Sequence, residues 1–198
     1  MSPTRCQKST KHAKIYALPT VFKGGGFALN IFVTSPWPAE SAIVLPDKHI
    51  VKMPLECCQM LSIVASPWYH NYGKINKVNG VPYRTEKGAF RNHPCTQWAG
   101  ETIDNAYWLI KWGMNLCDEY SIRYDNKTHS CYNTLLEAYY LFPHGKINKV
   151  TPFARAMPDE YKFDASIDTF TAYKMYIASK PWVASNYLRM PQRKPDWI

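Results

Sequence analysis

The sequence predicts a mainly α protein, because helix-like segments are numerous, strict alternation is rare and no β-α-β rhythm occurs. Apolar residues follow helical spacing over 47–65, 96–124, 131–142 and 164–180. The chain of 198 residues is 46% hydrophobic and 15% aromatic, which is typical of a folded protein with one substantial core. We therefore expect a compact helical domain with long loops and a basic N-terminal extension.

Residues 1–29 predict a basic, flexible extension, and 30–198 predict a single helical domain. No acidic residue precedes Asn30. The extension is either a solvated tail or an arm that lies along phosphates. Its basic residues are Arg5, Lys8, Lys11, Lys14 and Lys23.

The first part of the domain predicts irregular entry segments and then a helix. The apolar run at 28–33 is a strand or an extended entry into the core, and 35–40 is a loop because of its two prolines. Segment 47–65 is the first strong helix, and Pro54 predicts either a kink or two abutting helices there.

The second part predicts a long loop followed by three helices. Residues 66–94 are rich in Gly, Asn, Pro and Lys, and loops of this length are usually functional or disordered. Segment 96–124 is the longest helix and 131–142 a shorter one. Residues 151–163 are irregular, and 164–180 form the last helix.

The charge and the cysteines restrict the class of protein. A formal net charge of +9 favours an anionic partner, either nucleic acid or nucleotide. No apolar run is long enough to span a bilayer and the N-terminus lacks a signal peptide, so we expect no membrane contact. Six cysteines without C-x-x-C spacing predict reduced thiols and no disulfide.

A polar stripe on the first predicted helix is the strongest candidate site. His49, Lys52, Glu56 and Gln59 follow one another at steps of three, four and three, which places them on one helix face. The rest of this helix is largely apolar, so the stripe should face a cleft or a partner helix; the alternative is an ordinary solvent face. One imidazole, one amine, one carboxylate and one amide suit a site better than a solvent face.

The longest predicted helix carries a second polar and aromatic stripe. Glu119 and Arg123 are an i,i+4 pair, which is a surface salt bridge by default or else part of a ligand site. The helix start should attract anions, so Arg91 and His93 beside it suit a phosphate, and Cys95 could have a lowered pKa. The remaining stripe and its stacking candidates are Trp98, Glu101, Asn105, Trp108, Trp112 and Asn115.

No sequence motif indicates a metal or a cofactor, and we expect neither. The patterns H-x-x-x-H, H-E-x-x-H and G-x-x-x-x-G-K-[ST] are absent, although His49, Glu56, His93 and Asp47 could converge. The word GKINKV occurs twice, but its flanks differ, which favours coincidental loop chemistry over a shared site.

Several motifs together resemble an uncharacterised family of small tailed-phage proteins. The likeness covers most of 30–163, and family members usually begin at the stretch that matches Asn30. It implies a viral origin, and hence the host cytoplasm as location, but no activity. The motifs are NIFV, DKHIVKMPLECCQML, NHPCTQWA, CDEYSIRY and TPFARAMPDEY.

A more distant likeness carries chemistry. Asp47-Lys48-His49 followed by Glu56 is similar to the D-x-H…E helix of phage pyrimidine-dimer DNA glycosylases of the endonuclease V type. That resemblance implies a small helical fold and a glutamate that supports catalysis at a flipped or kinked lesion. It makes Glu56 the catalytic carboxylate and His49 a residue that orients substrate.

The chain departs from that family in two respects. The arginines around the family's glutamate are replaced here by Leu55 and Gln59. The family's nucleophile is the N-terminal amine of a threonine exposed after methionine removal, whereas here residue two is Ser2, far upstream of the similar segment. Lys52, one turn from Glu56, is a candidate substitute amine if burial lowers its pKa.

The sequence therefore predicts a phage-encoded DNA glycosylase-like enzyme in a basic, aromatic cleft between the two long helices. The alternatives are a non-catalytic anti-defence protein that sequesters a nucleotide signal, and a small protein that docks on a host enzyme through its long loop. The predicted catalytic residues are Glu56, His49 and Lys52; those predicted to bind nucleotide or phosphate are Gln59, Arg91, His93, Trp98, Asn105, Glu119 and Arg123.

Overall fold

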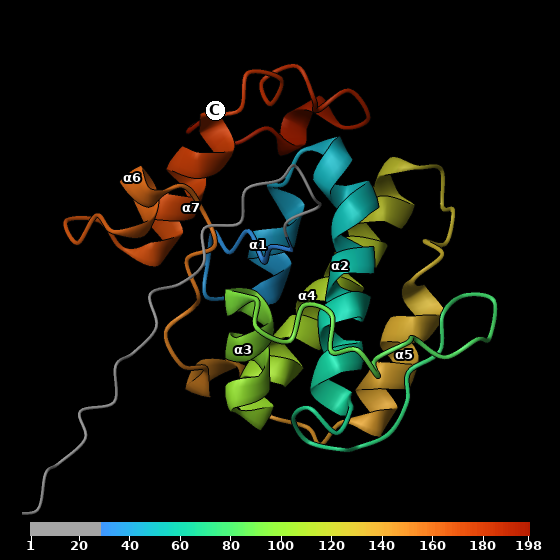
Figure 1. Cartoon of the computed structure of the whole chain (residues 1–198). Helices are drawn as coiled ribbons and strands as arrows, with labels where there is room; N and C mark the ends of the chain where they lie inside the picture. The colour runs from blue at the N-terminus through green and yellow to red at the C-terminus, as the bar shows by residue number, and fades with distance from the viewer. Residues whose placement is uncertain (1–28) are drawn as a thin grey trace, which may run out of the picture.

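The computed structural model describes residues 29–198, and within that range the chain is mainly helical and forms no strand (Figure 1). This confirms the predicted fold class, while the predicted extension falls almost entirely on residues outside the described range. The helices are α1 (Pro38–Ile43), α2 (Asp47–Ala65), α3 (Pro94–Glu101), α4 (Ile103–Arg123), α5 (Tyr132–Leu141), α6 (Asp159–Lys162) and α7 (Thr169–Ala178), with short 3₁₀ turns η1 (Ile147–Lys149) and η2 (Pro191–Arg193).

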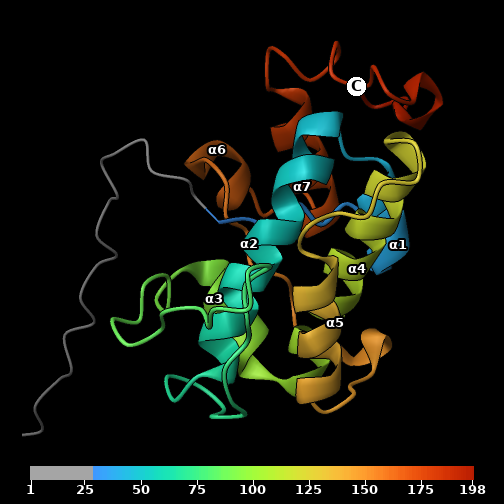
Figure 2. The ribbon, with the colours of Figure 1, turned by 90° about the vertical axis from the view of Figure 1, so that its right-hand side faces the viewer.

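Helices α2 and α4 form the centre of the molecule. They pack directly against each other, α1 and α3 cover α4, and α5 lies beside both (Figure 2). Large apolar side chains fill the space between them, among them Met53, Leu61, Trp108 and Trp112, which are almost completely buried. Close approach of α4 and α5 depends on Gly113, because an added Cβ would lie 2.8 Å from Leu135 Cδ2.

The predicted helix 96–124 is in fact two helices, so that prediction is wrong at its first turns. Thr102 is extended and separates α3 from α4, and its Oγ1 accepts a hydrogen bond from the Asn105 N–H at 3.1 Å. Threonine is a good N-cap because its hydroxyl satisfies one of the free N–H groups at a helix start. Loop 66–94 packs closely here, since the ring of Tyr69 contacts Gly100 where a Cβ would stand.

Prolines mislead the sequence analysis at two places. The stretch 35–40 is not only a loop, because Pro38 begins α1 in the first turn, where a missing N–H does no harm. Helix α2 continues through Pro54 as one helix, so the alternative of two abutting helices is wrong. Pro54 is buried, and the packing of α2 against α4 supports the helix on both sides of it.

A buried ion-pair network links the C-terminal end of α4 to the start of α2. Arg123 Nε donates to Glu119 Oε1 at 2.8 Å, and Arg123 Nη1 donates to Asp47 Oδ1 at 3.0 Å. The same guanidinium donates to the carbonyls of Leu45 and Ile43 at 2.8 and 2.9 Å. Glu119 and Arg123 are therefore not a surface salt bridge, as the default interpretation has it, but a link between α4 and the start of α2.

The C-terminal segment returns to this end of the molecule (Figure 1). Arg193 Nε donates to Glu119 Oε1 at 2.9 Å, the Asp47 N–H donates to the Asn186 carbonyl at 2.8 Å, and the Tyr187 hydroxyl donates to the Val44 carbonyl at 2.7 Å. These contacts hold the segment after α7 against the start of α2 and against Glu119 of α4. Over residues 29–198, no helix combines the length and the apolar character needed to cross a membrane.

Candidate active site

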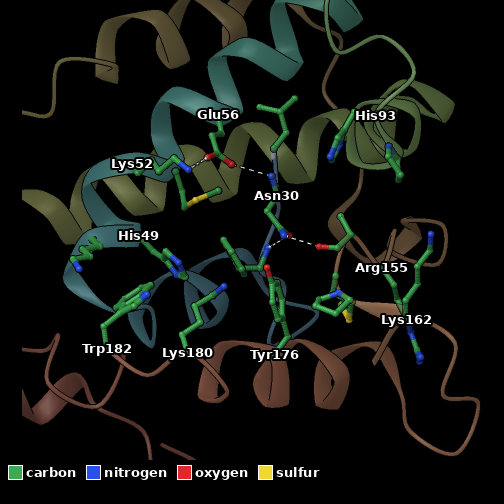
Figure 3. Close-up of a pocket in the computed structure, with 18 residues that line it drawn as sticks. Asn30, His49, Lys52, Glu56, His93, Arg155, Lys162, Tyr176, Lys180 and Trp182 are labelled. Carbon is green, nitrogen blue, oxygen red and sulfur yellow. Dashed lines mark hydrogen bonds and ion pairs between the residues drawn. The ribbon is translucent and has the colours of Figure 1, made fainter. Parts of the chain in front are cut away.

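A cleft of about 740 Å³ lies along the N-terminal half of α2 (Figure 3). One wall is the entry segment 29–32 together with the start of α3, and the opposite wall comes from the region around α6 and α7. The cleft does not lie between α2 and α4, because those two helices pack against each other. Its polar and aromatic lining consists of Asn30, Phe32, Lys48, His49, Lys52, Glu56, His93, Arg155, Lys162, Tyr176, Lys180 and Trp182.

Glu56 is the buried carboxylate of this cleft, with 3% of its surface exposed. Its Oε2 accepts a hydrogen bond from the Asn30 N–H at 2.9 Å, and its Oε1 lies 2.9 Å from Lys52 Nζ (Figure 3). Burial raises the pKa of Glu56, and the Lys52 ammonium and the Asn30 N–H act in the opposite direction. The helix repeat brings Lys52 and Glu56 together, since they are four residues apart on α2.

Asn30 holds the entry segment against Glu56. Its Oδ1 accepts hydrogen bonds from the N–H groups of Ile31 and Phe32, at 2.8 and 3.2 Å. Its Nδ2 donates to the Ala156 carbonyl at 2.7 Å, which joins the segment to the opposite wall. The sequence analysis missed Asn30 as a site residue; the available signal was a polar side chain at the head of an apolar run that becomes fully buried.

His49 lies in the aromatic part of the cleft. Its ring stacks on Phe32 with centroids 4.2 Å apart and meets Trp182 edge-on at 5.5 Å. Burial, together with the positive charges of Lys180 and Lys52, lowers the pKa of His49 to about 3. The imidazole is therefore neutral near pH 7, and its buried Nδ1 makes no hydrogen bond with the described part of the protein.

This lowered pKa predicts that acid destabilises the fold through His49. The unfolded imidazole takes up a proton as the pH falls below 6.5, whereas the folded one does not until about pH 3. His49 therefore does not lower the free energy of unfolding above pH 6.5, and below pH 6.5 it lowers this free energy by up to about 1.4 kcal/mol per pH unit. Urea denaturation of wild type and His49→Phe at pH 7, 6 and 5 measures it, and equal pH slopes for the two proteins would contradict it.

Lysines and aromatic rings from the C-terminal region complete the cleft. Lys180 Nζ lies 3.9 Å from the ring centroid of Tyr176, and Lys48 Nζ lies 4.6 Å from that of Trp182. Arg155 is held in place, because its guanidinium donates to the carbonyls of Tyr161, Asp164 and Ile167. Sequence reasoning missed this wall, since it comes from segments far from α2 in the chain.

Comparison with known proteins identifies a family. The model of the family described as pyrimidine dimer DNA glycosylase matches residues 29–133, which is more than half of the 198 residues. The chain belongs to this family. The match includes α2 with its Asp47-Lys48-His49…Glu56 pattern and so confirms the likeness seen in the sequence. No curated protein and no solved structure matches the chain.

The structure brings four of the predicted site residues together and separates the others. His49, Lys52, Glu56 and His93 line the cleft. His93 caps α3 with its Nδ1, which accepts the Cys95 N–H at 3.2 Å, and burial lowers its pKa. Cys95 itself is fully buried, and its pKa is raised by burial instead of lowered as predicted.

The remaining predicted residues do not reach the cleft. Gln59 lines cavities bounded by loop 66–94 instead, because it lies about two turns further along α2 than Lys52, beyond the end of the cleft. Arg91 lies over the ring of Trp68 at 4.2 Å. Trp98, Asn105, Glu119 and Arg123 are buried in the core or in the ion-pair network, and Trp108 and Trp112 are fully buried as well.

Proposed function

We propose that this protein is a DNA glycosylase that receives a damaged pyrimidine nucleotide in the cleft and cleaves its N-glycosidic bond with Glu56 as the catalytic carboxylate. One observation carries the proposal: within the family-matched segment, a buried carboxylate lies at the base of an open cleft with an amine 2.9 Å away. A nucleotide must leave the base stack to reach such a carboxylate, as it does in other enzymes that act on bases.

The chemistry requires a negative charge beside the sugar. When the bond between C1′ and the base breaks, the base leaves with the electron pair and positive charge develops on the sugar ring. The Lys52 ammonium and the Asn30 N–H favour the ionised form of Glu56 against the effect of burial. A fixed carboxylate in a partly dry site stabilises the developing charge more strongly than one in water.

Lys52 supplies the amine in this proposal. Its side chain is 44% exposed, so Nζ is accessible from the cleft while it contacts Glu56. After the base has left and the ionised Glu56 has stabilised the sugar cation, Glu56 can accept a proton from the Lys52 ammonium, because burial raises the pKa of its carboxyl group. The neutral amine then adds to C1′, and ring opening of the adduct gives a Schiff base.

The rest of the cleft binds the substrate. Phe32, His49 and Trp182 present aromatic faces and edges on which an unstacked base can pack. Lys48, Lys162 and Lys180 lie at the cleft and attract the phosphates on either side of the damaged nucleotide. A neutral imidazole at His49 can exchange a hydrogen bond with the base without adding charge.

The test uses a duplex with one cyclobutane pyrimidine dimer and the matched undamaged duplex. We expect the protein to cleave the N-glycosidic bond in the damaged strand of the first duplex and to leave the undamaged duplex intact. When borohydride is present, we expect a covalent protein–DNA adduct. Peptide mapping should place the adduct on Lys52, and Lys52→Arg should abolish it. Base release without any adduct would assign the attack to water, whereas tight nucleotide binding without turnover would favour a sequestering protein.

The N-terminal extension gives a prediction about DNA affinity. Leu29 and Asn30 line the cleft, so the extension joins the domain beside the bound DNA. Replacing its five basic residues by Gln should reduce the slope of log K against log salt by up to about 4, because each phosphate contact releases counterions. Fluorescence anisotropy at several salt concentrations measures this slope, and an unchanged slope would support a solvated tail.

A further inference from the structure

Cysteine thiols gather on the side of α2 that faces away from the cleft. Cys57 and Cys58 lie on α2, Cys117 lies on α4, and Cys131 is the N-cap of α5. All four are free and buried, and they lie close enough that a negative charge on one would raise the pKa of its neighbours. No trio of His, Cys, Asp or Glu within residues 29–198 is placed to hold a metal ion, so this cluster offers thiol chemistry instead.

Cys131 has the surroundings of a reactive thiol. The Cys58 thiol, which is placed to donate a hydrogen bond to the Cys131 sulfur, lowers the pKa of Cys131; burial opposes this shift, and a hydrogen bond from Ser130 reinforces it. Cys58 responds in the opposite direction, because the same hydrogen bond and burial raise its pKa. The directions of the two shifts favour the thiolate at Cys131 and the thiol at Cys58, which is the charge distribution of a nucleophile and its partner.

His129 fixes the position of Cys131. Its Nδ1 accepts a hydrogen bond from the Cys131 N–H at 3.1 Å, and its Nε2 lies 3.0 Å from the Val51 carbonyl. A carbonyl only accepts, so Nε2 carries the proton and the ring is in one defined tautomer. The ring thus links the start of α5 to α2, and these two elements carry the two thiols.

A second cavity gives access to only one member of this pair. Its volume is about 590 Å³, and Cys131 lines it whereas Cys58 does not. Val51, Leu55 and Gln59 form the α2 wall of this cavity, while His49, Lys52 and Glu56 face the cleft on an adjacent face of the helix. A small reagent that enters here meets Cys131 and not Cys58, and the proposed catalytic carboxylate does not line this cavity.

We propose that Cys131 and Cys58 form a peroxide-reactive thiol pair, in which Cys131 is attacked first and Cys58 resolves the product. The Cys131 thiolate attacks one oxygen of a hydroperoxide, so an S–O bond forms, the O–O bond breaks and the other oxygen leaves as an alcohol or water after gaining a proton. Cys58 then attacks the sulfenic sulfur, an S–S bond forms, and hydroxide leaves with the Cys58 proton as water. Two thiols lose two electrons and the hydroperoxide gains them.

The resulting disulfide would link α2 to the N-terminus of α5. Cys58 is two residues from Glu56, so the oxidised bond lies one half-turn from the carboxylate but on the opposite face of the helix. This inference does not depend on the proposed glycosylase activity, because its chemistry uses a separate cavity and separate residues.

The test exposes folded protein to limiting hydrogen peroxide at pH 7. A Cys6→Ser background leaves only the five cysteines within residues 29–198 to be oxidised. Non-reducing peptide mapping should find the Cys58–Cys131 disulfide as the main product. In Cys58→Ser, the sulfenic-acid reagent dimedone should label Cys131, and Cys131→Ser should give neither disulfide nor label. Cys95→Ser, which removes a buried thiol elsewhere, should react like the background protein.

A second measurement needs no change in the thiol cluster. Iodoacetamide in less than stoichiometric amount should alkylate Cys131 at least about ten-fold faster than any other described thiol, because the thiolate is the nucleophile. Preferential labelling of Cys117, or of Cys57 and Cys58, would overturn the proposal. Oxidation without any Cys58–Cys131 bond in the background protein would overturn it as well.

Discussion

Glu56→Gln is expected to lower turnover on dimer-containing DNA by about 10²–10⁴-fold, while the Kd for the same DNA changes by less than about three-fold. Gln keeps the size of the side chain and can still accept the Asn30 N–H, which lies 2.9 Å from the carboxylate in the wild type. It removes the negative charge that would face the sugar, and it removes the acceptor for the Lys52 proton. Single-turnover rates and anisotropy titrations measure the two quantities separately.

Gln59→Ala is the matched control for this variant. It changes a polar side chain on the same helix three residues further on, but on the side that faces loop 66–94. We expect wild-type turnover from it. Equal losses in Glu56→Gln and Gln59→Ala would point to a damaged helix, and full turnover in Glu56→Gln would exclude Glu56 as the catalytic carboxylate.

The pH profile adds a second signature for Glu56. Burial raises the pKa of this carboxyl group, so activity should fall on the acid side at a higher pH than an ordinary glutamate would give. In the fold the same shift acts opposite to that of His49: the folded protein takes up the Glu56 proton before the unfolded chain does, so this residue favours folding as the pH falls. Comparing Glu56→Gln with His49→Phe separates the two contributions.

The sequence predicted the helix that carries the site and three of its side chains. His49, Lys52 and Glu56 could be recognised because the helical repeat is local, so their common face follows from spacing alone. The same reasoning included Gln59, because spacing identifies a face of the helix but not where a cleft ends along the helix axis. The opposite wall could not be predicted, since Tyr176 and Lys180 reach the cleft only through the path of the chain after α5.

The second polar stripe shows why spacing does not determine environment. Asn105, Glu119 and Arg123 are spaced as a solvent or ligand face would be, but they are buried and satisfied by residues remote in sequence. Asn105, for example, donates to Thr151 Oγ1 at 2.7 Å and accepts from the Thr151 N–H at 2.9 Å. A sequence shows which groups need partners, but only the fold shows whether protein or ligand supplies them.

Arg123→Met is expected to destabilise the protein by about 3–5 kcal/mol, because it leaves buried carboxylates without their cation. The guanidinium is fully buried and bonds to Glu119, Asp47 and two backbone carbonyls, so no other side chain can replace all of its donors. For a chain of this size the loss corresponds to a decrease in Tm of roughly 6–20 °C. Urea denaturation at pH 7 gives the free energy of unfolding directly.

Arg193→Met is the matched control, since Arg193 also bonds to Glu119 but its side chain is 30% exposed. We expect it to cost about 1 kcal/mol or less, because a partly exposed pair is screened by water. The two variants also separate stability from binding. If Arg123→Met weakened DNA binding and left the free energy of unfolding unchanged, Arg123 would be a phosphate ligand after all. If it caused a large loss of stability and the folded fraction kept its affinity for DNA, Arg123 would be a structural residue that links α4 to α2, the helix that carries Glu56.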